Sequence, residues 1–284
     1  TAARRGLDVT LFDASSEIGG QFNIAKQVPG KEEFYETLRY FGKQIELTGV
    51  TLKLNQKVNA QDLAKAGFKH VVLATGVTPR TPEIDGINHP KVVGYLDVLR
   101  DKCKVGNTVA LIGAGGIGFD TAEFLLHEGT SPSLDQAKFF AEWGVDTAYA
   151  SAGGLKPAHI EKTPRKVYLL QRKTSKVGDG LGKTTGWIHR AALKKKKVEM
   201  IAGANYEAID EKGLHITFGE KRTNPTYIEC DNIVLCAGQE PLRELEAPLR
   251  AAGARVHVIG GALEAGELDA KRAILQGTRL AATL

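Results

Sequence analysis

The sequence predicts an α/β fold in which two Rossmann-like dinucleotide-binding domains are nested, one inserted in the other. Three observations predict it. An apolar strand over residues 109–112 runs into a glycine-rich turn and then a helix. An alternating strand over residues 7–13 ends in an acid. Strands that end in small residues, at 70–76 and 231–238, bracket the central glycine turn. Such alternation of strands and helices is typical of parallel sheets covered by helices.

The central turn carries the chemistry of a nucleotide site. Gly113, Gly115 and Gly118 have the G-x-G-x-x-G spacing, in which glycines allow a sharp turn, close approach of a pyrophosphate and close packing of the helix. The helix that follows the turn offers free N–H groups and a partial positive charge to phosphates, and Gly116 is counted among the predicted contacts. Because a buried strand precedes the motif and a helix follows it, we predict a dinucleotide site rather than a turn without a ligand.

A second set of candidate residues lies near the start of the chain. Asp13 ends a strand, and in a dinucleotide fold such an acid accepts hydrogen bonds from the ribose of the adenosine half. Gly19 and Gly20 permit close backbone approach and Gln21 can hydrogen-bond a ligand, although an ordinary glycine loop is the alternative. Lys31 opens the next predicted helix, where it would either bind a phosphate or face water.

Composition excludes several function classes. The chain has 284 residues, 42% of them hydrophobic, which suffices for a sizeable core and for two domains as readily as one. A net charge of +5 is too small and too dispersed to predict nucleic-acid binding. No stretch approaches the roughly 20 apolar residues of a membrane span. Cys103, Cys230 and Cys236 form no C-x-x-C pair, so we expect reduced thiols in a cytoplasmic protein.

The start of the chain indicates a domain cut short. Thr1 replaces an initiating methionine, and residues 1–6 are typical of the last turn of a helix closed by glycine. The strand and glycine motif that should precede this helix are not in the sequence, so we expect the chain to begin inside a nucleotide-binding domain. We predict that residues 1–98 and 253–284 form this outer domain and that residues 99–252 form the inserted one.

The choice of nicotinamide nucleotide follows from one strand end. The strand after the glycine helix is expected at residues 167–170, followed by Gln171, Arg172 and Lys173. An acid here would favour NAD, whereas a basic group accommodates the 2′-phosphate of NADP. Arg172 can bind that phosphate with two hydrogen bonds and Lys173 adds a point charge. A solvent-facing basic loop is the alternative, and the sequence favours NADP.

The spacing of the inserted domain is irregular. Arg172 follows Gly118 by 54 positions, whereas the dinucleotide fingerprint places this group about 20 further on. The surplus lies in residues 128–164, which are rich in Gly, Ser and Pro around one helical segment. Ser133 and Gln136 are predicted to form a capping box at the start of that helix.

Taken together, these marks resemble the flavoprotein disulfide reductase-like module, which holds FAD in its outer domain and a nicotinamide nucleotide in the inserted one. The matching marks include the end of the first strand, the central glycine motif and the three short turns at 74–76, 236–238 and 259–261. The family usually has Gly-Asp where this chain has Gly260-Gly261. The resemblance implies contacts to the cofactors from Asp13, Gly19, Gly20, Gln21, Lys31, Val58, Ala74, Thr75, Gly76, Gly260 and Gly261.

Four runs, at residues 16–25, 29–34, 180–189 and 267–273, are similar to the C-terminal half of bacterial NADPH-dependent 2,4-dienoyl-CoA reductases. These enzymes belong to the old yellow enzyme group and carry an FMN barrel and a 4Fe-4S cluster before this module. The resemblance implies that NADPH reduces FAD and that electrons then reach a dienoyl-CoA through the cluster and FMN, in the β-oxidation of unsaturated fatty acids. A lone histidine near a tryptophan, as His189 is near Trp187, is more often structural, and the proton donor of the family lies in the barrel. We therefore assign no catalytic residue here, and we assign no metal ligand.

Two alternatives stay open. The chain could be an electron-transfer subunit of another flavoprotein complex, such as a glutamate synthase-like one. It could also be a non-catalytic dinucleotide-binding scaffold or redox sensor, because related dehydrogenases hold ADP where FAD would sit. Gly261 in place of an aspartate is compatible with that second alternative.

Overall fold

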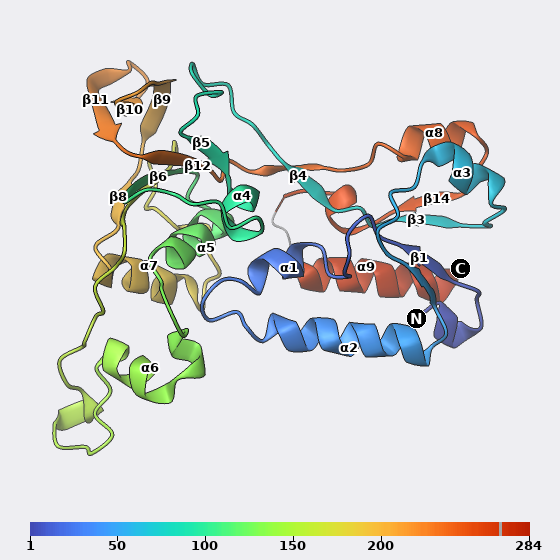
Figure 1. Ribbon diagram of the computed structural model, residues 1–284, viewed down its shortest axis with the longest axis horizontal. Coiled ribbons are helices and arrows are strands. Elements are labelled where there is room, and N and C mark those ends of the chain that lie inside the picture. Colours follow the sequence, from blue (N-terminus) through green and yellow to red (C-terminus); the bar gives the residue numbers. More distant parts are fainter. Residues whose placement is uncertain (267–268) are drawn as a thin grey trace. The chain divides into compact units, whose positions relative to one another are not determined.

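The computed structural model describes residues 1–266 and 269–284 and has the mixed α/β architecture that the sequence predicts (Figure 1). The chain divides into two compact units made of discontinuous segments. The first unit comprises Thr1–Asn23, Phe34–Arg80 and Gln239–Leu284, and the second Ile24–Glu33 and Thr81–Gly238. The second unit includes the strand and helix at 92–99, which pack on its sheet.

A parallel sheet of five strands organises the second unit, in the order β5-β12-β6-β7-β8. The strands are β5 (Val92–Gly94), β12 (Asn232–Leu235), β6 (Thr108–Ile112), β7 (Lys166–Leu170) and β8 (Glu199–Ile201). From β6 the chain passes through helix α5 (Gly116–Leu125) to β7 on one side, and β12 later pairs on the other side. Ligands of open α/β sheets bind where the strand order reverses in this way, at the carboxyl ends of the strands.

The sheet is covered on both faces because β6 alternates its side chains between two cores. Val109 and Leu111 pack with helices α4 (Tyr95–Leu99), α5 and α7 (Gly186–Lys195). Ala110 and Ile112 pack on a three-stranded antiparallel sheet of β9 (Ala204–Ile209), β10 (Gly213–Phe218) and β11 (Thr223–Glu229). These four side chains of β6 are at most 1% exposed, which explains why the strand is apolar from Val109 to Ile112.

The surplus residues 128–164 hold helix α6 (Gln136–Trp143) between two short 3₁₀ turns, η2 (Pro132–Leu134) and η3 (Ala152–Gly154). The predicted capping box of Ser133 and Gln136 is wrong. Asp135 caps the helix instead, because its carboxylate directly precedes the first turn and accepts from the N–H groups of Ala137 and Lys138. The Ser133 hydroxyl donates to Glu32 at 2.6 Å.

The first unit contains three two-stranded sheets among the described residues. β1 (Thr10–Phe12) and β2 (Thr51–Lys53) are parallel, as are β3 (Val71–Leu73) and β14 (Val256–Val258), whereas β4 (Val77–Pro79) and β13 (Gln239–Pro241) are antiparallel. The remaining elements are η1 (Ala3–Arg5), the first three residues of α1 (Gln21–Ala25), α2 (Phe34–Leu47), α3 (Ala60–Lys65), α8 (Glu246–Ala251), η4 (Gly260–Ala262) and α9 (Ala270–Thr283).

The core of the first unit is smaller than those of the second. Helices α3 and α8 contribute Leu63 and Leu249, which pack on Val71, Leu73 and Val256 of β3 and β14. Residues 267 and 268, part of the fourth run that carries the family resemblance, lie outside the described residues. Over the rest of the chain, each helix is too short or too polar to cross a bilayer.

Candidate functional site

The site is built around the turn between β6 and α5, where two glycines meet backbone directly. Gly113 has φ +111°, and a Cβ there would lie 2.2 Å from the carbonyl oxygen of Cys236. A Cβ on Gly118 would lie 1.9 Å from the carbonyl oxygen of Gly113. Gly115 and Gly116, by contrast, have open space within 4 Å of such a Cβ. The turn is therefore closed toward the sheet and open at the start of α5, which is the shape that a pyrophosphate requires.

The basic residues predicted to choose the nucleotide follow the neighbouring strand. Arg172 and Lys173 lie just beyond the end of β7, and both are exposed. The backbone N–H of Gly113 donates to the carbonyl oxygen of Leu170 at 2.9 Å, so the glycine turn and the end of β7 are joined directly. The structure thus brings these two parts of the predicted nucleotide site to the same edge of the sheet.

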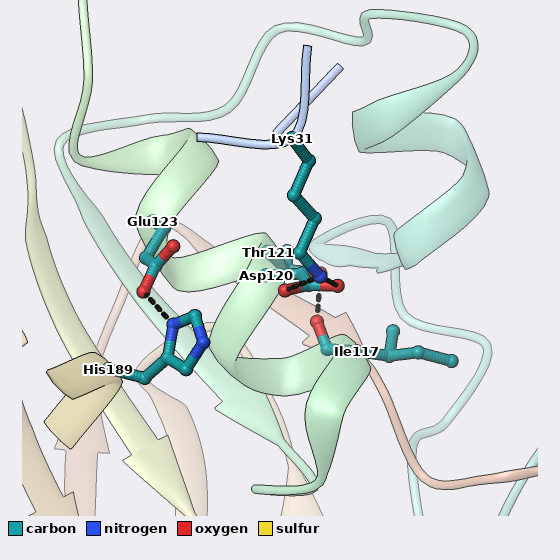
Figure 2. Close-up of polar contacts among 6 residues, drawn as sticks. All are labelled: Lys31, Ile117, Asp120, Thr121, Glu123 and His189. Atoms are coloured by element: carbon teal, nitrogen blue, oxygen red, sulfur yellow. Dashed lines mark hydrogen bonds and ion pairs between the residues drawn. The ribbon is translucent and has the colours of Figure 1, made fainter. Parts of the chain in front are cut away.

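Two carboxylates on α5 each receive a positive or ionisable partner (Figure 2). Lys31 places its Nζ 2.7 Å from both carboxylate oxygens of Asp120. His189 of α7 donates from its Nδ1 to Glu123 Oε1 at 2.8 Å. Lys31 was predicted to bind a phosphate or face water, and its ammonium group forms an ion pair with Asp120. Its side chain is 31% exposed, and an ammonium group has three N–H donors, so binding of a phosphate by Lys31 stays a prediction.

The pair between Glu123 and His189 is largely shielded, with 13% and 32% of the two side chains exposed. The hydrogen bond to Glu123 raises the pKa of His189, burial opposes that rise, and the charges of Glu123 and Asp120 add to it while Lys31 opposes it. The imidazole therefore holds its proton more strongly than an ordinary histidine.

These acids were missed in the sequence because their partners are remote. Lys31 and Asp120 are 89 positions apart, and His189 and Glu123 are 66 apart, so no local spacing relates them. One signal was present: Asp120 and Glu123 are three residues apart on a helix whose start the glycine motif fixes, and residues at that spacing share a face.

In the first unit, the predicted residues lie at strand and helix ends. Asp13 follows β1, and its Oδ1 accepts from the N–H of Ser15 at 2.8 Å. Gly19 and Gly20 both have positive φ and immediately precede α1, of which Gln21 is the exposed first residue.

Ala74, Thr75 and Gly76 form the turn from β3 to β4. The Thr75 hydroxyl donates to the carbonyl oxygen of Leu242. The N–H of Leu242 donates to the carbonyl oxygen of Gly76 at 3.0 Å, so this turn is tied to the chain beyond β13.

Three of the predicted contact residues are engaged by the fold itself. Val58 packs its side chain against the small core of the first unit. Gly260 uses its N–H to donate to Gln276 Oε1 at 2.7 Å, and Gly261 follows it in η4. Their assignment to a cofactor stays a prediction.

The three thiols are free and none is activated. Burial raises the pKa of Cys236 to about 12 and also raises the pKa values of Cys230 and Cys103. Thiols with such pKa values are protonated at neutral pH and are poor nucleophiles. Among the described residues, His, Cys, Asp and Glu side chains form no group of three or more that could hold a metal ion.

Comparison with protein families identifies this architecture. The model of the pyridine nucleotide-disulphide oxidoreductases matches residues 1–263. The chain belongs to this family. Membership implies binding of FAD and a nicotinamide nucleotide, and the open glycine turn at the start of α5 fits such a group because no Cβ fills it.

Individual relatives cover the chain almost completely. A metal reductase of Desulforamulus reducens is 27% identical over 267 residues, 93% of this chain and 38% of that protein. An NADH oxidase of Thermoanaerobacter brockii is 26% identical over 273 residues, 94% of this chain and 36% of that protein. A structure of a 2-naphthoyl-CoA reductase complex has a TM-score of 0.80 and 25% identity over the whole chain, which covers 37% of that protein. The chain thus spans little more than a third of the length of these relatives.

Replacement of Gly118 by Ala should destabilise the protein, because its Cβ would collide with the Gly113 carbonyl. We expect a loss of about 1–3 kcal/mol in the free energy of unfolding, as for other overpacked sites. Gly116→Ala is the matched control, and its open position should keep the change below about 1 kcal/mol. Thermal unfolding followed by circular dichroism measures both, and equal losses would contradict the assigned packing.

The raised pKa of His189 predicts a pH-dependent contribution to stability. A group whose pKa is raised in the folded state stabilises that state fully when the pH is below its unfolded-state pKa, about 6.5 for histidine. This stabilisation is lost as the pH rises through the folded-state pKa. His189→Gln should therefore reduce the free energy of unfolding by about 0.5–1 kcal/mol at about pH 5.5 and by less at about pH 8.5. Melting temperatures measured at the two pH values should show a larger decrease at the lower pH.

His159→Gln, an exposed histidine, serves as the control for that measurement. An NMR titration of the imidazole should also show the pKa of His189 falling in Glu123→Gln. A His189 pKa that Glu123→Gln leaves unchanged would refute the role of this pair.

Proposed function

We propose that this chain is the FAD- and NADPH-binding part of an NADPH-dependent 2,4-dienoyl-CoA reductase. The choice of NADPH is carried by the end of β7, where Gln171, Arg172 and Lys173 stand in place of an acid and adjoin the glycine turn. The choice of a CoA thioester is supported by the runs at 29–34 and 180–189, and by similarity to a structure whose protein is named a 2-naphthoyl-CoA reductase.

Each unit has its own task in this proposal. In the second unit the turn from Gly113 to Gly118 would hold the pyrophosphate of NADPH, and Arg172 and Lys173 its 2′-phosphate. In the first unit Asp13, with the turns at 19–21 and 74–76, would hold FAD. When bound, the flavin supplies the ability to accept a hydride from the nicotinamide ring. The chain itself contributes binding, orientation and exclusion of water.

The electrons must leave by a route other than the thiols of this chain. Cys103, Cys230 and Cys236 are separate from one another in the sequence, free and protonated at neutral pH, so none can exchange disulfides readily. We propose that the acceptor is a 4Fe-4S cluster followed by FMN in the rest of the enzyme. A dienoyl-CoA would be reduced there to an enoyl-CoA during β-oxidation of unsaturated fatty acids.

A second candidate is an electron-transfer module that serves another acceptor. The observation in its favour is that relatives named a metal reductase and an NADH oxidase match nearly all of this chain over little more than a third of their own length. The region in which they match this chain is the module itself.

Anaerobic titration of the full native protein with NADPH or NADH separates these candidates. Bleaching of the flavin by NADPH, followed by reoxidation as the absorbance of an added 2,4-dienoyl-CoA falls, supports the reductase. If NADPH reduces the flavin but the flavin stays reduced after the dienoyl-CoA is added, the module serves another acceptor. Protein purified without flavin absorbance, and unable to bind added FAD, would contradict both.

Arg172→Gln should weaken NADPH binding selectively. Charge-assisted hydrogen bonds contribute about 1.5–3 kcal/mol, so we expect about a 10–100-fold rise in the Kd of NADPH. NADH lacks the 2′-phosphate, and its Kd should stay within about twofold. Lys212→Gln removes the same charge from the turn between β9 and β10 and should change neither value. Quenching of protein fluorescence measures these constants, and equal losses for both nucleotides would contradict the assignment.

A further inference from the structure

Gln171 occupies a defined position at the nucleotide edge of the second unit. It directly follows β7, and both its backbone N–H and its carbonyl oxygen form hydrogen bonds. Its N–H donates to the carbonyl oxygen of Ile201 at 2.9 Å, and its own carbonyl oxygen accepts from the N–H of Ala204 at 3.1 Å. The backbone hydrogen bonds therefore hold this residue between the end of β8 and the start of β9, independently of its side chain.

The side chain of Gln171 holds the turn that follows it. Its Nε2 donates to the carbonyl oxygen of Lys173 at 3.0 Å and to that of Ser175 at 2.7 Å. Both partners are acceptors, so the amide must present its NH₂ group, and its two hydrogens match two carbonyls. The carbonyl oxygen of Lys173 also accepts from the N–H of Gly203 at 2.9 Å. The turn 172–175 is thus restrained from two directions, although it belongs to no helix or strand.

The restrained turn carries the two basic residues of the proposed NADPH site. Arg172 and Lys173 are exposed, whereas Gln171 is half-buried. The charge of Arg172 also acts on the hydroxyl of Tyr206 in β9, a group whose pKa is raised mainly by burial. Long basic side chains lose rotamer freedom when they bind, so a backbone fixed beforehand lowers the cost of gripping a phosphate.

The identity of the residue at this strand end matters for a second reason. In a dinucleotide fold that binds NAD, an acid at the end of the strand after the glycine helix, here β7, accepts a hydrogen bond from the ribose 2′-hydroxyl. Here the position holds a neutral amide that is turned into its own loop. A carboxylate could not replace it, because an ionised carboxylate only accepts hydrogen bonds and would face two carbonyl oxygens.

We propose that Gln171 is a positioning residue for recognition of the 2′-phosphate, which acts by fixing the turn that presents Arg172 and Lys173. This inference rests on the proposed use of NADPH. It assigns the selectivity to a three-residue unit in which one member binds no ligand.

The test compares binding of 2′,5′-ADP and 5′-ADP to the purified protein by calorimetry, because the two ligands differ only in the 2′-phosphate. Gln171→Leu keeps most of the volume and removes both donors. We expect it to weaken 2′,5′-ADP by about 5–20-fold and to leave 5′-ADP within about twofold, as loss of one or two hydrogen bonds would do. Gln171→Glu should weaken 2′,5′-ADP further, because it adds a negative charge beside the phosphate. Gln61→Leu, the same change on α3, is the matched control.

A double-mutant cycle separates positioning from general stabilisation. If Gln171 acts through the two basic residues, Gln171→Leu should have little further effect in a protein that already carries Arg172→Gln and Lys173→Gln. Gln171→Asn retains the amide on a shorter side chain and should give an intermediate loss, which keeps the test informative should Gln171→Leu not fold.

The outcomes distinguish the inference from the function on which it rests. A wild-type protein that prefers 2′,5′-ADP while Gln171→Leu retains that preference overturns the inference alone. Equal weakening of both ligands by Gln171→Leu, or additive losses in the cycle, also overturns it. A wild-type protein that does not distinguish the two ligands overturns the proposed use of NADPH, and the inference with it.

Discussion

The second unit depends on the close approach of α5 to the end of β6. Gly118 sits against the carbonyl oxygen of Gly113, and Gly113 against that of Cys236 at the end of β12, so strand, turn and helix meet with no side chain between them. This contact places the first turn of α5 at the point where the strand order reverses. The free N–H groups of that turn are therefore directed to the carboxyl edge of the sheet, where a nucleotide pyrophosphate would bind.

The same helix sets the electrostatics around the turn. Asp120 and Glu123 would repel each other across one turn, yet each is matched by a partner from a distant segment, Lys31 or His189. Lys31 belongs to the stretch Ile24–Glu33, which lies in the second unit although the residues on either side of it belong to the first. Ile24 and Val28 pack in the core that α5 also lines, so apolar burial and ion pairing fix this stretch together.

In our proposal, the choice of nucleotide depends on the shape of the turn after β7 as well as on its charges. The turn after β7 belongs to no helix or strand. Hydrogen bonds from the side-chain amide of Gln171 and the backbone N–H of Gly203 restrain its shape. Exposed basic side chains by themselves would be mobile and would bind phosphate weakly, because ordering them costs entropy. A restrained backbone reduces that cost without adding a contact to the ligand.

The sequence by itself determined the α/β architecture, the apolar strand that ends at Ile112 and the glycine turn, because these follow from local periodicity and from glycines with particular backbone needs. Only the tertiary structure decided that Lys31 pairs with Asp120, that His189 has Glu123 as its partner and that Asp135 rather than Ser133 caps α6. The first two join residues 89 and 66 positions apart, and no sequence spacing encodes such contacts. Ser133 and Asp135 are both residue types that cap helices. Asp135 caps α6 because the helix begins at the next residue, so that its carboxylate directly precedes the first turn.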